Sequence, residues 1–163
     1  MIWLGIDPGP RLTGWALIEL DGGRPPRFVD GGHAPAEQAV QQLERASRVA
    51  LEVLAPGLFS RDRYEGLIGT AIVQGGLQWQ LRAIGARVIE LTAGQWRADV
   101  VGSSSPTDPA IEAALRRRVT GLPAPPVIPA GKLVHVCDAV GVALAAAYQP
   151  GKQVTLALAR GRR

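Results

Sequence analysis

The feature that most constrains the fold is an uncharged N-terminal run that ends in a carboxylate. Residues 1–6 have no charged side chain, and Asp7 follows them directly, ahead of Pro8 and Gly9. Such a run predicts a strand that is buried on both faces. An ionised carboxylate at its end is unfavourable unless the next turn donates hydrogen bonds to it or a cation binds it. We therefore expect a buried strand that ends in a tight turn or at a metal site.

Turn signals and hydrophobic periodicity predict a mixed α/β domain. Five segments have the apolar runs or the alternation of strands: 2–7, 12–19, 27–32, 49–54 and 88–91. Four segments have helical character: 36–48, 64–84, 108–119 and 133–148. Because Asp21-Gly22-Gly23 is a hairpin signal, the first three strands should be antiparallel neighbours. The order predicts a five-stranded mixed sheet, three antiparallel strands and then parallel ones, flanked by helices.

The chain's length and composition indicate one domain. Its 163 residues are 47% hydrophobic and 20% charged, which suits a single globular core over residues 1–150 with a basic tail over 151–163. No stretch reaches the roughly 18 apolar residues of a membrane helix, and the N-terminus does not read as a signal peptide. A single cysteine, Cys137, fits a reducing cytoplasm.

The charge balance favours an acidic partner. The formal net charge is +4, and among 18 basic residues only Lys132 and Lys152 are lysines. Arginine's planar fork suits phosphate, so nucleic acid is the expected partner. The excess of arginine over lysine could equally reflect the base composition of the source genome.

Three acidic residues and one histidine lie in strongly apolar surroundings. Asp7 ends the first strand, Glu52 lies in the fourth, and Asp138 lies in the first turn of the expected last helix, three residues after His135. Parallel neighbouring strands would bring Asp7 and Glu52 together, and clustered carboxylates repel unless a cation neutralises them. Mg²⁺ or Mn²⁺ suits such oxygen ligands, and a pair of these ions can promote phosphodiester hydrolysis.

Each of these four residues also has an ordinary structural explanation. Asp7 could open an Asp-Pro-Gly turn, and Glu52 could face solvent on an edge. Asp138 could cap the last helix, and His135 could be a satisfied histidine. Glu65 is a rival for the second acid, although it lies within a helical pattern.

Together the four residues follow the order and spacing of a known family. Gly5-Ile6-Asp7-Pro8-Gly9 with Thr13-Gly14-Trp15 resembles the first strand and turn of RuvC-type Holliday junction resolvases, in the RNase H-like superfamily. Ala50-Leu51-Glu52 resembles the strand of the second acid, residues 92–102 a middle segment, and His135–Leu144 the closing helix. The family usually has aspartate where His135 stands.

The resemblance implies a homodimeric endonuclease that cuts four-way DNA junctions in recombination and repair. It implies that Asp7, Glu52, Asp138 and His135 hold one or two Mg²⁺ ions, for which Mn²⁺ could substitute. A water activated there would cut the strand to leave a 5′-phosphate, with His135 as ligand or base. The helix over 64–84, with its small residues, is the expected dimer interface, although it could instead pack internally.

Basic and aromatic residues are expected to contact the DNA. Phe59 could stack on an unpaired base or fold back into the core, whereas Trp79 and Trp96 are expected to be packing residues. If about six phosphates are neutralised, log affinity should fall with log salt at a slope of about −5. The expected phosphate contacts are Arg11, Arg82, Arg97, Lys132 and the Arg116-Arg117-Arg118 cluster.

Three other functions compete with this interpretation. A shorter RuvC-like nuclease group, which acts on structured pre-ribosomal RNA, shares the Asp-Pro-Gly opening, but the Glu-Arg-Leu-Thr segment typical of that group is missing from this sequence. Sugar kinases and actin-like ATPases have a similar phosphate loop but need two domains. A non-catalytic DNA-binding module of the same fold is the third alternative.

Overall fold

The computed structural model describes residues 1–55, 64–124 and 128–148. Its strands are β1 (Ile2–Asp7), β2 (Thr13–Glu19), β3 (Arg27–Ala34), β4 (Arg48–Val53) and β5 (Val88–Thr92). Its helices are α1 (Ala36–Gln41), α2 (Tyr64–Ala83), α3 (Ala93–Val101), α4 (Asp108–Arg118) and α5 (Ala130–Ala147), with a 3₁₀ turn over Gln42–Arg45. The expected tail, 151–163, lies outside the described residues.

The five strands form one sheet in the order β3-β2-β1-β4-β5. The β1–β2 and β2–β3 pairs are antiparallel, whereas the β1–β4 and β4–β5 pairs are parallel. This confirms the expected mixed sheet. The uncharged N-terminal run is its central strand, and the burial of Trp3 through Asp7 explains why that run has no charge before its last residue.

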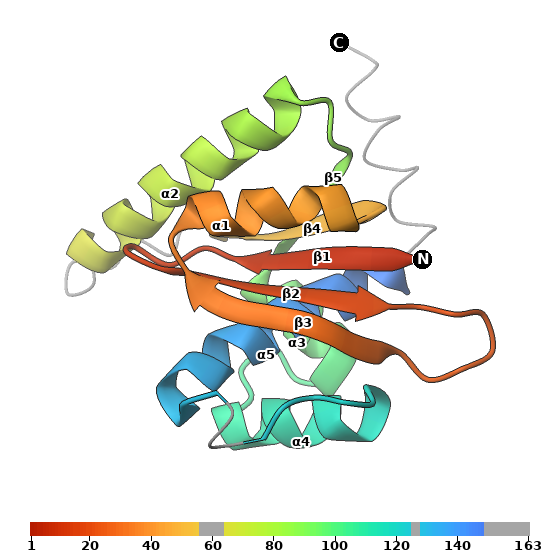
Figure 1. Ribbon diagram of the computed structural model, residues 1–163. Coiled ribbons are helices and arrows are strands. Elements are labelled where there is room, and N and C mark those ends of the chain that lie inside the picture. The colour runs from red at the N-terminus through yellow and green to blue at the C-terminus, as the bar shows by residue number, and fades with distance from the viewer. Residues whose placement is uncertain (56–63, 125–127, 149–163) are drawn as a thin grey trace, which may run out of the picture.

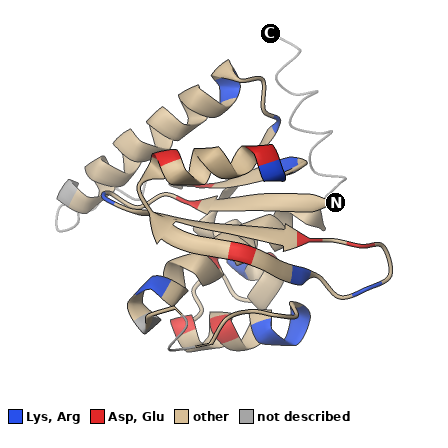
Figure 2. Ribbon diagram, in the orientation of Figure 1, with Lys and Arg blue, Asp and Glu red and all other residues tan. Residues whose placement is uncertain are grey.

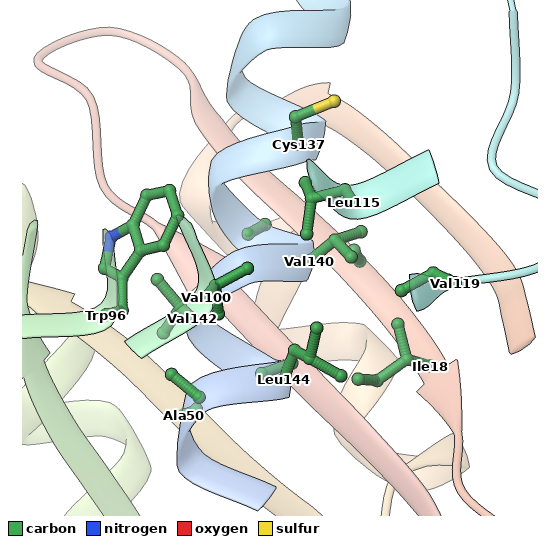
Figure 3. Close-up of a cluster of buried hydrophobic side chains, with 14 of the residues drawn as sticks. Ile18, Ala50, Trp96, Val100, Leu115, Val119, Cys137, Val140, Val142 and Leu144 are labelled. Atoms are coloured by element: carbon green, nitrogen blue, oxygen red, sulfur yellow. The ribbon is translucent and has the colours of Figure 1, made fainter. Parts of the chain in front are cut away.

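Helices cover both faces of the sheet (Figure 1), with α1 and α2 on one side and α3, α4 and α5 on the other. Side chains alternate between the two faces, as strand geometry requires. Leu4 and Ile6 of β1 pack with Leu77 and Leu81 of α2, whereas Trp3 packs on the side of α5. Figure 3 shows part of the apolar cluster between the sheet and helices α3, α4 and α5, where Trp96 lies beside Val100 and Val142.

Two glycines let α5 lie directly against the sheet. A Cβ added at Gly5 of β1 would overlap the carbonyl of Ala139, and one added at Gly14 of β2 would overlap the backbone of His135. Larger residues at either position would push α5 outward. The close approach fixes the height of the α5 side chains above the ends of β1 and β2.

Two expected boundaries are corrected, and one helix was not expected. The helix expected over 36–48 is α1 and the 3₁₀ turn, and β4 starts at Arg48. Helix α3 was not expected, although Thr92 and Gln95 form a capping box and Gly102 ends the helix in a left-handed conformation. Helix α5 begins at Ala130, which puts Asp138 in its third turn instead of its first and excludes a capping role. Among the described residues, no helix is long and apolar enough to cross a membrane.

Candidate active site

The sheet brings the first two acids to one end and one face. Asp7 is the last residue of β1, and Glu52 is next to last in β4. Because Ile6 pairs with Leu51, the next positions along the parallel strands are Asp7 and Glu52. Alternation puts both side chains on the α5 side, with Gly5 and Ala50. The pairing that the sequence predicted for these carboxylates is therefore present.

Glu52 is held by Trp96, which the sequence predicted to be a packing residue. The indole nitrogen of Trp96, on α3, donates a hydrogen bond of 2.6 Å to Oε2 of Glu52. Burial, and then the charge of Asp7, raise the pKa of Glu52 to about 8, against which the bond from Trp96 acts. Glu52 is thus not a solvent-facing edge residue. Its carboxylate is an internal base beside a second negative charge.

Asp138 of α5 completes the group of acids. Nη2 of Arg97 lies 3.3 Å from its Oδ2, while Oδ1 is buried and has no hydrogen-bond partner within the described part of the chain. Burial and then the charge of Asp7 raise the pKa of Asp138 to about 7, and Arg97 opposes this rise. Asp138 is therefore electrostatically linked to Asp7 and has one oxygen free for a further partner.

His135 lies between two residues at the same end of the sheet. Its Nδ1 is 3.0 Å from Oδ2 of Asp7, and this hydrogen bond raises the pKa of His135. On its other side, the ring of His33 stacks against it, with centroids 4.3 Å apart and planes 15° apart. Sequence reasoning missed His33, which no motif marked. Its register partner is Gly14, and Gly14 in turn pairs with Asp7, so only the strand pairing could have revealed it.

The donor set fits a divalent cation, although the ligands are not assembled around one point. Among the residues described, no three His, Cys, Asp or Glu side chains are grouped closely enough to hold an ion as they stand. Asp7, Glu52 and Asp138 are each turned toward a protein partner. However, the unpaired Oδ1 of Asp138 and the clustered carboxylates, whose pKa values burial and mutual repulsion raise, suit a bound cation.

Three of the expected DNA-contacting residues lie at this end of the sheet. Arg11 is exposed in the turn after β1, Lys132 is exposed in the first turn of α5, and Arg97 contacts Asp138. The guanidinium of Arg97 also lies 5.2 Å from the centre of the Trp96 ring. These residues could contact a phosphate near the acids.

The remaining basic residues that were expected to contact DNA lie away from this end of the sheet (Figure 2). Arg82 pairs with Glu90 near the end of α2. It lies about 20 Å along that helix from Gly69, where an added Cβ would meet Pro10 in the turn after β1.

The Arg116 cluster is at the opposite end of α4 from Asp108. The chain there passes beside the start of β3, where Arg27 bridges Thr120. Arg116 donates hydrogen bonds to Glu112 and to the carbonyls of Leu122 and Pro123, so its role here is structural. Arg117 and Arg118 are exposed. Phe59 lies outside the described residues, as does the side chain of Glu65.

Comparison with known proteins points to one group. No protein-family model matches the chain. RuvC crossover junction endodeoxyribonuclease of Acinetobacter baumannii is 31% identical over 111 residues, which are 61% of this chain and 60% of that protein. Over this match the chain spans about 60% of its relative's length. RuvC of Polynucleobacter asymbioticus is 27% identical, over 100% of this chain and 99% of its own length.

The fold agrees with these sequence matches. The structure of T. thermophilus RuvC in complex with a Holliday junction substrate aligns with a TM-score of 0.63 and 22% identity, over 91% of this chain and 93% of that one. This likeness concerns the fold, the five-stranded RNase H-like sheet with its helices. The chain is thus similar in sequence to RuvC crossover junction endodeoxyribonucleases and shares the fold of solved RuvC structures, as its motifs predicted.

Proposed function

We propose that this chain is an endonuclease that cuts four-way DNA junctions by hydrolysing one phosphodiester bond in each of two symmetric strands. The observation that supports this most is the convergence of Asp7, Glu52 and Asp138, with the charge of Asp7 raising the pKa of both others. The similarity to crossover junction endodeoxyribonucleases supports a four-way DNA junction as the substrate. Its role would be in DNA recombination and repair, and its location the cytoplasm, where such DNA is found.

The proposed cofactor is Mg²⁺, with Mn²⁺ able to substitute, as one or two ions in each site. Asp7, Glu52, Asp138 and His135 would hold it. A bound divalent ion would supply an activated water and neutralise charge at the leaving oxygen. The chain itself supplies a partly buried cluster of carboxylates, which a divalent cation would occupy in competition with protons. To bind an ion, the carboxylates would exchange part of their present hydrogen bonding for metal contacts.

His135 has a geometry suited to moving a proton. With the proton on Nδ1, the imidazole donates to Oδ2 of Asp7, and Nε2 keeps a lone pair. That lone pair could ligate an ion or accept a proton from the attacking water. A raised pKa favours proton acceptance near neutral pH. We propose that cleavage leaves a 5′-phosphate and a 3′-hydroxyl.

Arg97 would contact both a phosphate of the substrate and the carboxylate of Asp138. Its side chain approaches Asp138 at 3.3 Å and is about one quarter exposed, so part of the guanidinium remains available to a phosphate. Lys132 and Arg11 would add contacts on either side, through their exposed side chains. Such contacts orient the backbone of the DNA without reading its sequence.

We propose that the active form is a homodimer that meets through α2. This helix exposes Ile72 (70%) and Trp79 (72%), and an added Cβ at Gly75 would meet nothing within 4 Å. Exposed large apolar side chains on one helix are typical of a protein interface. The small residue Gly69 is directed at Pro10 of its own chain and is not available for the partner. Two symmetric sites would match two symmetric cuts.

The function is tested by comparing substrates in one assay. A synthetic four-way DNA junction, a linear duplex of the same sequence and a structured RNA of similar size are incubated with the protein and Mg²⁺ or Mn²⁺, and separately with EDTA. We expect paired nicks in the junction alone, and only when metal is present. Cleavage of the RNA but not the junction would favour the RNA-processing alternative. Tight junction binding without cleavage under either metal would indicate a non-catalytic DNA-binding module.

A further inference from the structure

His135 lies directly over the one residue that separates Asp7 from a second histidine. Gly14 of β2 pairs with Asp7 of β1 on one side and with His33 of β3 on the other. A Cβ on Gly14 would overlap the backbone of His135, so the glycine leaves the space that His135 fills. The neighbouring strands therefore present Asp7 to one edge of the His135 ring and His33 to one of its faces.

The two neighbours restrain the ring in different ways. The hydrogen bond from Nδ1 to Oδ2 of Asp7, 3.0 Å away, holds one edge of the ring. A single hydrogen bond of this length still tolerates a range of ring tilts, because the second side-chain torsion of histidine has broad minima. The nearly parallel ring of His33, with centroids 4.3 Å apart, limits these tilts. The hydrogen bond to Asp7 and the stacked ring of His33 together define one orientation of the His135 ring.

Hydrogen bonding at Nδ1 does not explain why histidine occupies position 33. Nδ1 of His33 is buried and lacks a hydrogen-bond partner among the residues that the structure describes. A buried polar atom without a partner weakens the folded state, so an apolar side chain would satisfy stability better. Besides an interaction with the backbone of Leu12, the ring of His33 makes its contact through its face, with His135.

We propose that His33 is a positioning residue that holds the imidazole of His135 with Nδ1 toward Asp7 and Nε2 free. The consequence for cleavage rests on the proposed function, whereas the orientation of the ring does not. A flat ring at position 33 is sufficient for this role, so phenylalanine should replace histidine and aliphatic side chains should not.

The orientation is measured on the full chain without metal and without DNA. The sequence has only two histidines, so every variant at position 33 leaves His135 as the sole source of imidazole signals. At alkaline pH, where the ring is neutral, the ¹⁵N shifts of its two nitrogens differ widely when one tautomer is held and approach each other when tautomers exchange. We expect a wide separation in the unaltered protein and in His33→Phe, and a narrow one in His33→Ala.

Two further variants of β3 serve as controls for the ring measurement. Val29→Ala shortens another β3 side chain, which packs on the opposite face, and should leave the His135 signals unchanged. His33→Leu fills the space without a flat ring and replaces His33→Ala if the alanine variant does not fold. An unchanged separation in a folded His33→Ala or His33→Leu protein would overturn the proposal, and so would a separation lost equally in His33→Phe.

Catalysis gives an independent readout. Junction cleavage by His33→Ala should show a kcat about tenfold lower at an unchanged Kd for the junction, and His33→Phe should restore kcat to within about twofold. Equal kcat in all variants would contradict a positioning role in catalysis. If the unaltered protein cuts no junction at all, the proposed function fails, and the ring signals still decide whether His33 orients His135.

Discussion

The indole of Trp96 lies 2.6 Å from Oε2 of Glu52, so a fully buried aromatic ring anchors one of the clustered acids. Close packing fixes the ring itself, because a Cβ on Gly141 of α5 would overlap its six-membered ring. Trp96 thereby joins α3, α5 and β4 at the candidate active site. The neighbouring Arg97 contacts Asp138, so one short helix supports two of the three acids.

Trp96→Phe should weaken cleavage and shift its pH dependence. The variant keeps a buried ring but removes the donor that opposes the raised pKa of Glu52, so the pKa of that carboxyl rises further. We expect the acid limb of the kcat/KM profile for junction cleavage to move to higher pH, and kcat at pH 7 to fall about tenfold. Trp3→Phe is the matched control, because it truncates another buried tryptophan of the same core cluster. Identical pH profiles in the two variants would argue against the role of the Trp96–Glu52 bond.

Glu52→Gln should abolish cleavage while the fold remains intact. The substitution preserves shape and removes the proposed ligand charge, so we expect kcat to fall by at least about 100-fold with little change in melting temperature. Glu90→Gln, in which a partly exposed carboxylate loses its pairing with Arg82, should cut normally. Normal cleavage by Glu52→Gln together with loss of activity in Glu65→Gln would instead assign the second acid to Glu65.

The sequence alone predicted much of the sheet and the outline of the site. All five strands were found, because apolar runs and hairpin signals are local. Asp7, Glu52 and Asp138 stood out because charged residues are unusual in such apolar segments. The structure brings all three together with His135, although whether they form the metal site stays a prediction.

The contacts that hold these residues could not be predicted from local patterns. Trp96 and Glu52 are 44 positions apart, and Asp7 and His135 are 128 apart, so no periodicity links them. Helix α3 was missed because Gly94 and the polar Gln95 weaken its periodicity, although its capping box was readable. The helical pattern over 36–48 ended early, since the chain must extend at Arg48 to pair with β1.

Arg97→Gln should reduce both junction affinity and cleavage near neutral pH. Removing the guanidinium lets the pKa of Asp138 rise further above about 7, so a larger fraction of that carboxyl is protonated. We expect a weaker salt dependence of junction binding, with a log–log slope smaller by about one, and a cleavage optimum at higher pH. Arg82→Gln, at the far end of α2, is the control for loss of one positive charge. Equal effects of the two substitutions would mean that net charge alone is responsible.

The metal-free protein should lose stability as pH rises from about 5 to 8. Glu52 and Asp138 have pKa values of about 8 and about 7 in the folded chain, above their unfolded values of 4.5 and 3.8. The folded state therefore binds more protons than the unfolded state across this range, and stability falls with rising pH. The raised pKa of His135 acts in the same direction. Thermal unfolding at a series of pH values measures this slope.

Added Mg²⁺ or Mn²⁺ should restore much of the folding stability that the metal-free protein loses as pH rises. An ion takes the place of the protons, so the rise in melting temperature on adding metal should be larger at pH 8 than at pH 5. The double variant Glu52→Gln, Asp138→Asn should show a flatter pH dependence and little response to metal. A metal response that is the same at both pH values, or is retained in the double variant, would contradict a cation site at these carboxylates.

The most direct test of the account is a paired measurement on Asp7→Asn. Binding of a synthetic four-way junction is measured by fluorescence anisotropy, and cutting of the same junction by gel in Mg²⁺ and in Mn²⁺. Asp30→Asn, which weakens the ion pair of Asp30 with Arg45 on the same sheet, serves as the control. We expect Asp7→Asn to bind the junction about as tightly as the unaltered chain and to leave it uncut, while Asp30→Asn cuts normally. Cutting by Asp7→Asn at a rate near that of the unaltered chain would contradict the proposed role of Asp7.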